Sequence, residues 1–102
     1  MTPPTTDNQC IRAATVDGIF YPQEPAQLRQ SVERLLERST AGALGAQSIV
    51  SPHAAFDYSG AAAAAAFKAC AGRPVELAVL IGPVHRESVD AVLLSESCAF
   101  QT

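Results

Sequence analysis

Apolar residues recur at helical spacing in the stretch PAQLRQSVERLLERSTAG, which begins at Pro25. Charged and amide residues separate its apolar positions, which are Leu28, Val32, Leu35 and Leu36. This spacing places the four side chains on one face of a helix. Proline is favoured in the first turn of a helix and glycine beyond its end, so we expect the helix to begin at Pro25 and to end at Gly42.

A second helix is predicted from the stretch DYSGAAAAAAFKACAG, which begins at Asp57. Alanine has the highest helix propensity of any residue, and the stretch holds an unbroken alanine run at 61–66. Its small side chains allow a helix to lie close to a sheet. Ser59 precedes the run and is a typical N-cap residue, while Gly72 and Pro74 are expected to end the helix.

Three short aliphatic runs have the composition of buried strands: AQSIVS at 46–51, VELAVLIGP at 75–83 and DAVLLS at 90–95. The first two flank the alanine-rich helix, which predicts parallel strands joined by a right-handed crossover. The fold class expected is therefore α/β, with a mostly parallel sheet and flanking helices. Because these elements are few for a sheet covered on both faces, we expect residues 10–102 to be part of a larger domain, after a flexible N-terminal arm at 1–9.

Composition excludes several classes of function. The 102 residues are 48% hydrophobic and carry a net charge of −3, with both signs interspersed, so no electrostatic basis for binding nucleic acid is present. The sequence contains no membrane-spanning run, no signal peptide and no glycine-rich nucleotide motif. Three cysteines without a CxxC pair argue against a disulfide framework and predict a reducing, cytoplasmic location.

The two histidines occupy matched places, because each follows a predicted strand. His53 lies two residues beyond Ser51, and His85 lies four residues beyond Ile81. Ligands of open α/β sheets bind outside the carboxyl ends of the strands, so both imidazoles are expected at one edge, within reach of a shared metal ion. Two histidines are fewer ligands than a closed iron or zinc site needs, and a loop histidine bonded to backbone is the alternative for each.

Residues near His53 offer further candidates. Asp57 and Tyr58 are close enough in sequence to act as metal ligands or to orient them, although Asp57 also suits a helix start and Tyr58 also suits packing. Ser59 lacks the surroundings of a nucleophile, and its predicted capping role explains it better. Cys70 is interpreted as a buried residue at a helix end.

Several of these stretches together resemble the Memo-like family, also called the AmmeMemoRadiSam system protein B family. The resemblance rests on four stretches in the family's order: RAATVDGIFYP (12–22), SPHAAFDYSGAAAAAAF (51–67), VLIGPVHR (79–86) and CAFQT (98–102). It implies a fold similar to the LigB-type class III extradiol dioxygenases. It further implies a cytosolic protein with a copper or iron site, in which His53 and His85 match the family's ligand histidines. The functions that the resemblance implies are redox chemistry of the bound metal or phosphotyrosine-peptide signalling.

The chain departs from the family pattern at three motif positions and in length. Ala55 and Phe56 stand where the family has glycine and tyrosine, and Val84 stands where it has serine, so the changes at 56 and 84 each remove a hydroxyl. Family members continue well beyond the point matching Thr102, and their cysteine ligand lies in that part. The resemblance therefore implies a partial site, and an incomplete sheet predicts a poorly stable or self-associating chain.

Three functions remain open from the sequence. The first is a redox-related metal-binding protein that uses His53 and His85, with enzyme activity undecided because the catalytic set is incomplete. The second is a metal-free module that docks a small molecule, a peptide or a phosphopeptide, with Arg86 or Arg12 contacting the anion. The third is a nonfunctional truncated product.

Overall fold

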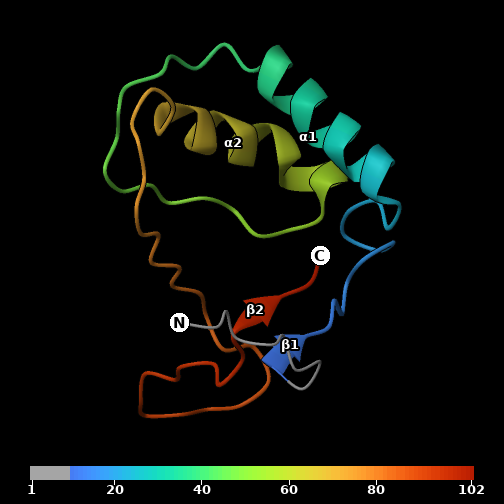
Figure 1. Cartoon of the computed structure of the whole chain (residues 1–102), viewed down its shortest axis with the longest axis vertical. Helices are drawn as coiled ribbons and strands as arrows, with labels where there is room; N and C mark the ends of the chain where they lie inside the picture. Colours follow the sequence, from blue (N-terminus) through green and yellow to red (C-terminus); the bar gives the residue numbers. More distant parts are fainter. Residues whose placement is uncertain (1–9) are drawn as a thin grey trace, which may run out of the picture. The chain divides into compact units, whose positions relative to one another are not determined.

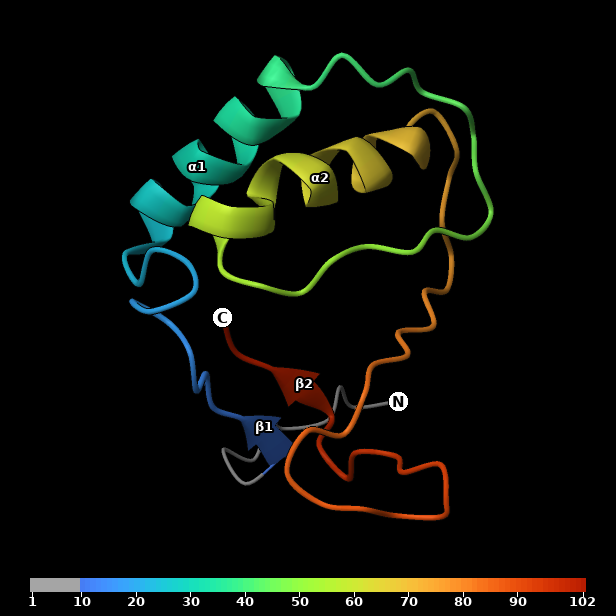
Figure 2. The ribbon, with the colours of Figure 1, turned by 180° about the vertical axis from the view of Figure 1, so that it is seen from behind.

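The computed structural model describes residues 10–102, so the arm predicted at 1–9 lies outside the described residues. The chain divides into two compact units. A helical unit comprises 15–74, and a second unit joins residues 10–14 to the stretch 75–102. The described residues form two helices, in the helical unit, and two short strands, in the other. Figure 1 and, from behind, Figure 2 show the helices side by side and the strands side by side.

Helix α1 spans Pro25–Arg38, and its existence and start are as predicted. Pro25 begins the helix. Proline has no backbone N–H, and this costs nothing in the first turn, because amides there have no acceptor within the helix. The helix ends at Arg38, four residues before Gly42, and the backbone amide of the C-cap residue Ser39 donates to the carbonyl oxygens of Leu35 and Leu36. The backbone of Ser39 thus satisfies carbonyl groups that the helix end leaves open.

Helix α2 spans Phe56–Ala69 and contains the whole alanine run. The prediction that Ser59 caps it is wrong, because the helix begins three residues earlier and Ala55 holds the N-cap position without a side-chain hydrogen bond. The Ser59 hydroxyl instead donates back to the carbonyl oxygen of Ala54, at 3.0 Å. Serine within a first turn commonly makes such a local bond, and here it ties the helix to the segment before it.

The two helices approach closely at a glycine. A Cβ atom placed on Gly60 of α2 would lie 3.0 Å from Cδ1 of Leu35 on α1. Gly60 and Ala64, one turn apart, are the two buried residues of α2. Small residues on α2 thus allow the Leu35 side chain to approach the α2 backbone, so the close neighbour is another helix and not the sheet that the alanine-rich composition predicted.

A lysine connects the C-terminal ends of both helices. Lys68 in the last turn of α2 directs its Nζ to the carbonyl oxygens of Leu36, at 3.1 Å, and Ser39, at 2.7 Å. These oxygens lie at the negative end of the α1 dipole, where a cation is favourable. The contact therefore fastens the end of α1 to α2.

The run 46–51, predicted as a strand, belongs to the loop between the helices and has no strand geometry. The loop is attached to the end of α2, because the amides of Leu44 and Ala46 both donate to the carbonyl oxygen of Ala69, at 3.2 and 2.9 Å. Arg73 adds a bond of 3.1 Å to the carbonyl oxygen of Gly45. Of the run itself, only Ala46 takes part in these bonds, so a helix end holds the start of the run and no neighbouring strand pairs with it among the described residues.

The strands of the second unit are β1, Ile11–Arg12, and β2, Ala99–Phe100, and they pair in parallel with Ile11 opposite Ala99. This register places Cys10 opposite Cys98, with Cα atoms 5.2 Å apart, and the two form a disulfide. The expectation of no disulfide is therefore wrong. The two cysteines are 88 positions apart in the sequence, so their spacing gave no sign that a parallel strand register brings them together.

The runs 75–83 and 90–95, also predicted as strands, have no strand geometry either. Their aliphatic side chains are exposed: Leu80 to 88%, Ile81 to 94% and Leu94 to 90%. A strand exists only when a neighbour completes its hydrogen bonds, and among the described residues only β1 and β2 form such a ladder. The α/β class is confirmed in this coarse form, two helices and one short parallel strand pair.

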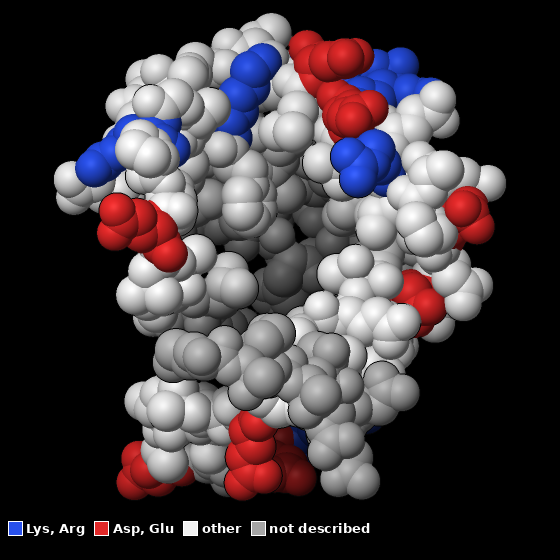
Figure 3. Space-filling model, in the orientation of Figure 1, with Lys and Arg blue, Asp and Glu red and all other residues white. Residues whose placement is uncertain are grey.

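Charge and helix hydropathy are the remaining general features of the described residues. Basic and acidic side chains are interspersed on the face drawn in Figure 3, and no broad basic field is visible there. No described helix is long and apolar enough to cross a membrane. The cytoplasmic location stays a prediction, and the Cys10–Cys98 disulfide argues against it, because disulfides are rare in reducing compartments.

Candidate functional site

A tight turn at residues 16–21 forms one wall of the candidate site. The carbonyl oxygen of Val16 accepts from the amides of Ile19, at 3.1 Å, and Phe20, at 2.8 Å. Gly18 adopts φ +72° and donates its amide to the carbonyl oxygen of Tyr21, at 2.8 Å. Because side chains disfavour this left-handed conformation, glycine at position 18 allows the turn to close.

This turn is joined to the start of α2. The amide of Phe56, an N-terminal helix group without a helical partner, donates to the carbonyl oxygen of Phe20, at 2.8 Å. The rings of Phe56 and Tyr21 also face one another in a tilted pair, with centroids 6.0 Å apart. Such tilted pairs add stability beyond the area that they bury. The two contacts hold the turn and the helix in a fixed relation.

A cavity of about 270 Å³ lies where the turn, the segment before α2 and the first turns of α2 meet. His53 lines this cavity, and the remaining lining is mostly apolar or aromatic: Val16, Phe20, Tyr21, Ser51, Pro52, Ala54, Phe56, Ser59, Gly60, Ala63 and Phe67. Concave sites with apolar walls and a few polar groups are typical of small-molecule binding. The structure thus places His53 in a candidate binding cavity of the helical unit.

The segment that carries His53 is positioned by α2. The Ser59 hydroxyl bonds to the carbonyl oxygen of Ala54, the residue after His53, and also lies 3.5 Å from that of Ala55. A serine hydroxyl that donates its proton to a backbone carbonyl has a structural role. This agrees with the sequence-based preference for a structural Ser59 over a nucleophile, although the role is not the predicted N-cap.

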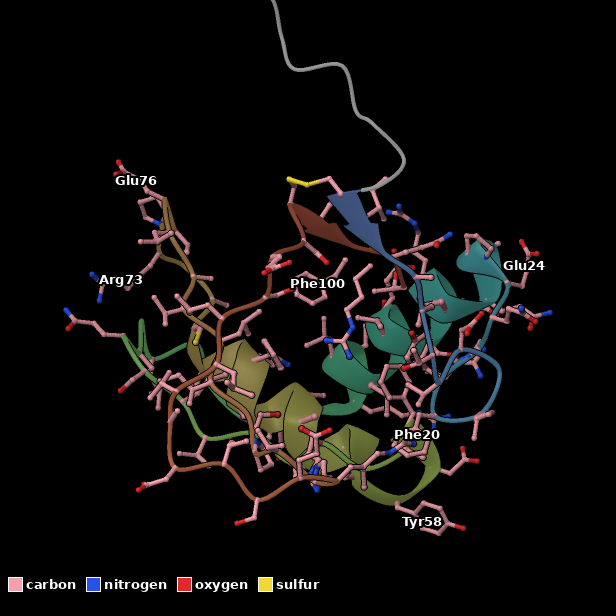
Figure 4. The ribbon with its side chains drawn as sticks, turned by 90° about the horizontal axis from the view of Figure 1, so that it is seen from below. Phe20, Glu24, Tyr58, Arg73, Glu76 and Phe100 are labelled. Atoms are coloured by element: carbon pink, nitrogen blue, oxygen red, sulfur yellow. A yellow bond between two sulfur atoms is a disulfide. The ribbon has the colours of Figure 1, made fainter. Side chains whose placement is uncertain are left out.

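Asp57 and Tyr58 do not line the cavity. Asp57 lies in the first turn of α2, where its charge complements the helix dipole, so the helix-start interpretation is confirmed. The interpretation that Tyr58 packs is wrong, because its side chain is 89% exposed and projects away from the chain in Figure 4. Their predicted action beside a metal stays untested.

His85 and Arg86 belong to the other unit, in the exposed stretch after 75–83. Arg12 is in the same unit and lies over the Phe100 ring, with its guanidinium carbon 5.8 Å from the centroid. Neither histidine follows a strand, so the strand-end argument for a shared edge is not supported by the structure. Their meeting at a metal stays a prediction.

The described residues do not form a complete metal centre. Among them, no group of three or more histidine, cysteine, aspartate or glutamate side chains could hold an ion. The cavity lining supplies one imidazole, with the hydroxyls of Ser51, Ser59 and Tyr21 as its other side-chain polar groups. Copper and iron sites need more nitrogen, sulfur or carboxylate ligands than this cavity contains.

Sequence reasoning missed the aromatic wall formed by Phe20, Tyr21 and Phe56. The signal for the first two was available in the stretch VDGIFY, since an Asp-Gly pair marks a tight turn and two aromatic residues come after it, beyond Ile19. An apolar groove between the helices, of about 320 Å³, was also missed. It shares Phe56, Gly60, Ala63 and Phe67 with the cavity and is completed by Val32, Leu35, Leu36 and Ala64.

Comparison with known proteins identifies the family. The family model described as Memo-like protein matches residues 12–102, so the chain belongs to the Memo-like family. A MEMO1 family protein of Methanopyrus kandleri is 32% identical over 89% of this chain and 36% of its own length. A MEMO1 family protein of Methanothermobacter thermautotrophicus is 34% identical over 90% of this chain and 36% of its own length. Protein MEMO1 of Danio rerio is 30% identical over 95% of this chain and 33% of its own length.

The chain thus spans about a third of the length of these curated relatives. No solved structure gives a significant match to it.

Proposed function

We propose that the chain contributes His53 and His85 as nitrogen ligands to a copper or iron site with a redox-related role in a Memo-like domain. The observation that supports this best is the place of His53 beside apolar and aromatic walls. Apolar surroundings limit the access of water to a metal ligand and tune the metal. A bound copper or iron ion would supply one-electron chemistry there.

The remaining ligands would come from outside the described residues, since these lack a group of three. In this proposal Ser59 and the Phe20 carbonyl are positioning groups, because they fix the segment and the helix start beside His53. A fold similar to the LigB-type extradiol dioxygenases is part of the proposal. It does not by itself assign dioxygenase activity, because one fold supports many chemistries.

Metal titration of the chain and two variants tests the proposal. Cu(II) and Fe(II) are added separately to the anaerobic protein, and bound metal is measured after gel filtration. We expect His53→Ala and His85→Ala each to weaken binding at least about tenfold, since loss of groups that merely support a ligand costs that much. Glu87→Gln, an exposed neighbour of His85, is the control and should bind as the parent does. Equal metal binding by the parent, both histidine variants and the Glu87→Gln control contradicts the proposal.

A metal-free peptide-binding function is the second candidate, and the aromatic walls of the cavity favour it. Phe20 and Tyr21 present rings there beside Phe56, and rigid aromatic surfaces are common anchors for ligands. Titration with a phosphotyrosine peptide, with and without a chelator, separates the two functions. Binding that the chelator leaves unchanged and that Arg86→Ala weakens supports docking, whereas no binding contradicts it.

A further inference from the structure

The two cysteines of the second unit lie side by side. Their Cα atoms are 5.2 Å apart, and their sulfurs form the disulfide drawn in Figure 4. Cys98 is exposed and Cys10 is half-buried, so a reductant can reach the bond from solvent. Two electrons and two protons from a dithiol convert the disulfide into two thiols, and the dithiol itself becomes a cyclic disulfide. The reduced form therefore carries two thiols on neighbouring segments of one unit.

The strand pair between these segments is too short to persist without a cross-link. β1 and β2 have two residues each, and the cysteines beside them are 88 positions apart. Loop closure costs more entropy as the loop lengthens, and even an isolated two-stranded hairpin is marginally stable in water. A reduced chain therefore keeps β1 beside β2 only if something other than a disulfide joins the two cysteines.

A metal ion is the cross-link that reducing conditions allow. Disulfides are rare in reducing compartments, where grouped cysteines more commonly bind a metal or act in catalysis. Thiolates are soft ligands, which select Cu(I) and Zn(II). Structural Zn(II) takes four ligands, and no group of three or more suitable side chains exists among residues 10–102. Cu(I) needs only two thiolates, so it is the ion that suits this pair.

Two neighbouring groups suit a site of charged sulfurs. The backbone amide of Cys98 lies 3.1 Å from Sγ of Cys10 and also donates to the Cys10 carbonyl oxygen, at 2.7 Å. Hydrogen bonds to ligand sulfurs are a common way in which proteins tune thiolate-bound metals. Two thiolates and one Cu(I) carry a net charge of about −1. Arg12, which is paired with Phe100 two residues beyond the cysteines, places a cation in the same unit.

We propose that Cys10 and Cys98, once reduced, bind a single Cu(I) ion between their thiolates, and that this ion fastens β1 to β2 in place of the disulfide. Each thiol releases its proton to solvent and forms one copper–sulfur bond. The copper stays Cu(I), so no electron is transferred in this step. The site uses neither His53 nor His85 and is independent of the function proposed for them.

Anaerobic titration with Cu(I) tests the site. The chain is reduced with a dithiol, freed of it by gel filtration, and titrated in competition with a chromogenic Cu(I) chelator. We expect the reduced parent to bind Cu(I) at least about tenfold more tightly than Cys10→Ser, Cys98→Ser or the oxidised parent does. Cys70→Ser, at the free cysteine, should bind as the reduced parent does. Binding of equal strength in the oxidised parent or in either of the first two variants overturns the proposal.

The histidine variants separate this site from the one proposed above. His53→Ala and His85→Ala should bind Cu(I) as tightly as the reduced parent, whatever their effect on Cu(II) and Fe(II). If the histidine variants lose Cu(I) and the cysteine variants keep it, the ion belongs to the histidines and the inference is wrong. Failure of the histidine proposal alone leaves Cu(I) binding by the cysteines unchanged.

Hydrogen exchange tests the cross-link. The amide of Gln101 donates across the strand pair to the carbonyl oxygen of Arg12, at 2.9 Å. We expect Cu(I) to slow exchange of this amide at least about tenfold in the reduced parent and to have no effect in Cys10→Ser. Cu(I) that binds without slowing this exchange does not join the strands, and that result also overturns the proposal.

Discussion

The amide of Phe56 donates a hydrogen bond of 2.8 Å to the carbonyl oxygen of Phe20. The bond joins the first residue of α2 to a turn 36 positions earlier in the chain. Both residues line the cavity that contains His53, so the shape of this cavity depends on the turn as much as on the helix.

Replacement of Gly18 tests this dependence. Gly18→Ala places a side chain at φ +72° and is expected to lower the free energy of unfolding by about 1–3 kcal/mol. Hydrogen exchange at the Phe56 amide should accelerate, because its acceptor belongs to the same turn. Gly42→Ala is the control, since Gly42 does not have a positive φ and its nearest contact is at 4.0 Å. Equal effects of both variants would contradict the role assigned to the turn.

Loss of the Lys68 ammonium should loosen the helix pair. Lys68→Met keeps the apolar stem and removes the two bonds to the carbonyl oxygens of Leu36 and Ser39, so we expect a loss of about 1–2 kcal/mol in denaturant unfolding. Arg29→Met makes a comparable change at an exposed position of α1. A Lys68→Met variant as stable as this control would show that the lysine is dispensable.

The contact between Gly60 and Leu35 predicts an energetic coupling. Alanine at position 60 gains about 1 kcal/mol in helix propensity, but its Cβ would meet Leu35 at 3.0 Å. We expect Gly60→Ala to be neutral or destabilising in the parent and stabilising by about 1 kcal/mol in a Leu35→Ala background. A double-mutant cycle measures the difference. If the effect of Gly60→Ala is the same in both backgrounds, the close approach does not limit packing.

Reduction of the Cys10–Cys98 disulfide should release the strand pair. The amide of Gln101 donates to the carbonyl oxygen of Arg12, at 2.9 Å, and we expect its hydrogen exchange to accelerate on reduction or in Cys98→Ser. A link that spans 88 positions contributes at most about 4–5 kcal/mol in the chain-entropy account. Cys70→Ser, at the free cysteine, should change neither the hydrogen exchange of Gln101 nor the free energy of unfolding. Exchange that is insensitive to reductant would remove the disulfide from this role.

The sequence predicts the helices well because their signals are local. Apolar spacing and Pro25 define α1, and the alanine run defines α2. The start of α2 differs because Ser59 is suited to a cap but bonds within the first turn instead. Neither helix required knowledge of what packs against it.

The strands could not be predicted, because a strand depends on a neighbour. The runs 75–83 and 90–95 have suitable composition, but no ladder includes them among the described residues. The strands that do form, β1 and β2, have two residues each, and the pairing of Cys10 with Cys98 accompanies them. Two residues are too few for any periodicity to show.

The candidate site was predicted in part. His53 lines a cavity, as a functional residue would, while the strand-end argument that chose it is not supported by the structure. Tyr21, in the turn that forms part of the aromatic wall, precedes His53 by 32 positions in the sequence. Only the folded chain shows that the two residues line the same cavity.

The disulfide also closes a covalent ring that contains both helices and the exposed stretch 75–96. One protease cut at any peptide bond between Cys10 and Cys98 opens this ring without separating the pieces. A nicked molecule therefore keeps its mass, apart from one added water, and migrates as a single chain on a non-reducing gel. A single cut within this ring becomes visible as two fragments only after reductant is added.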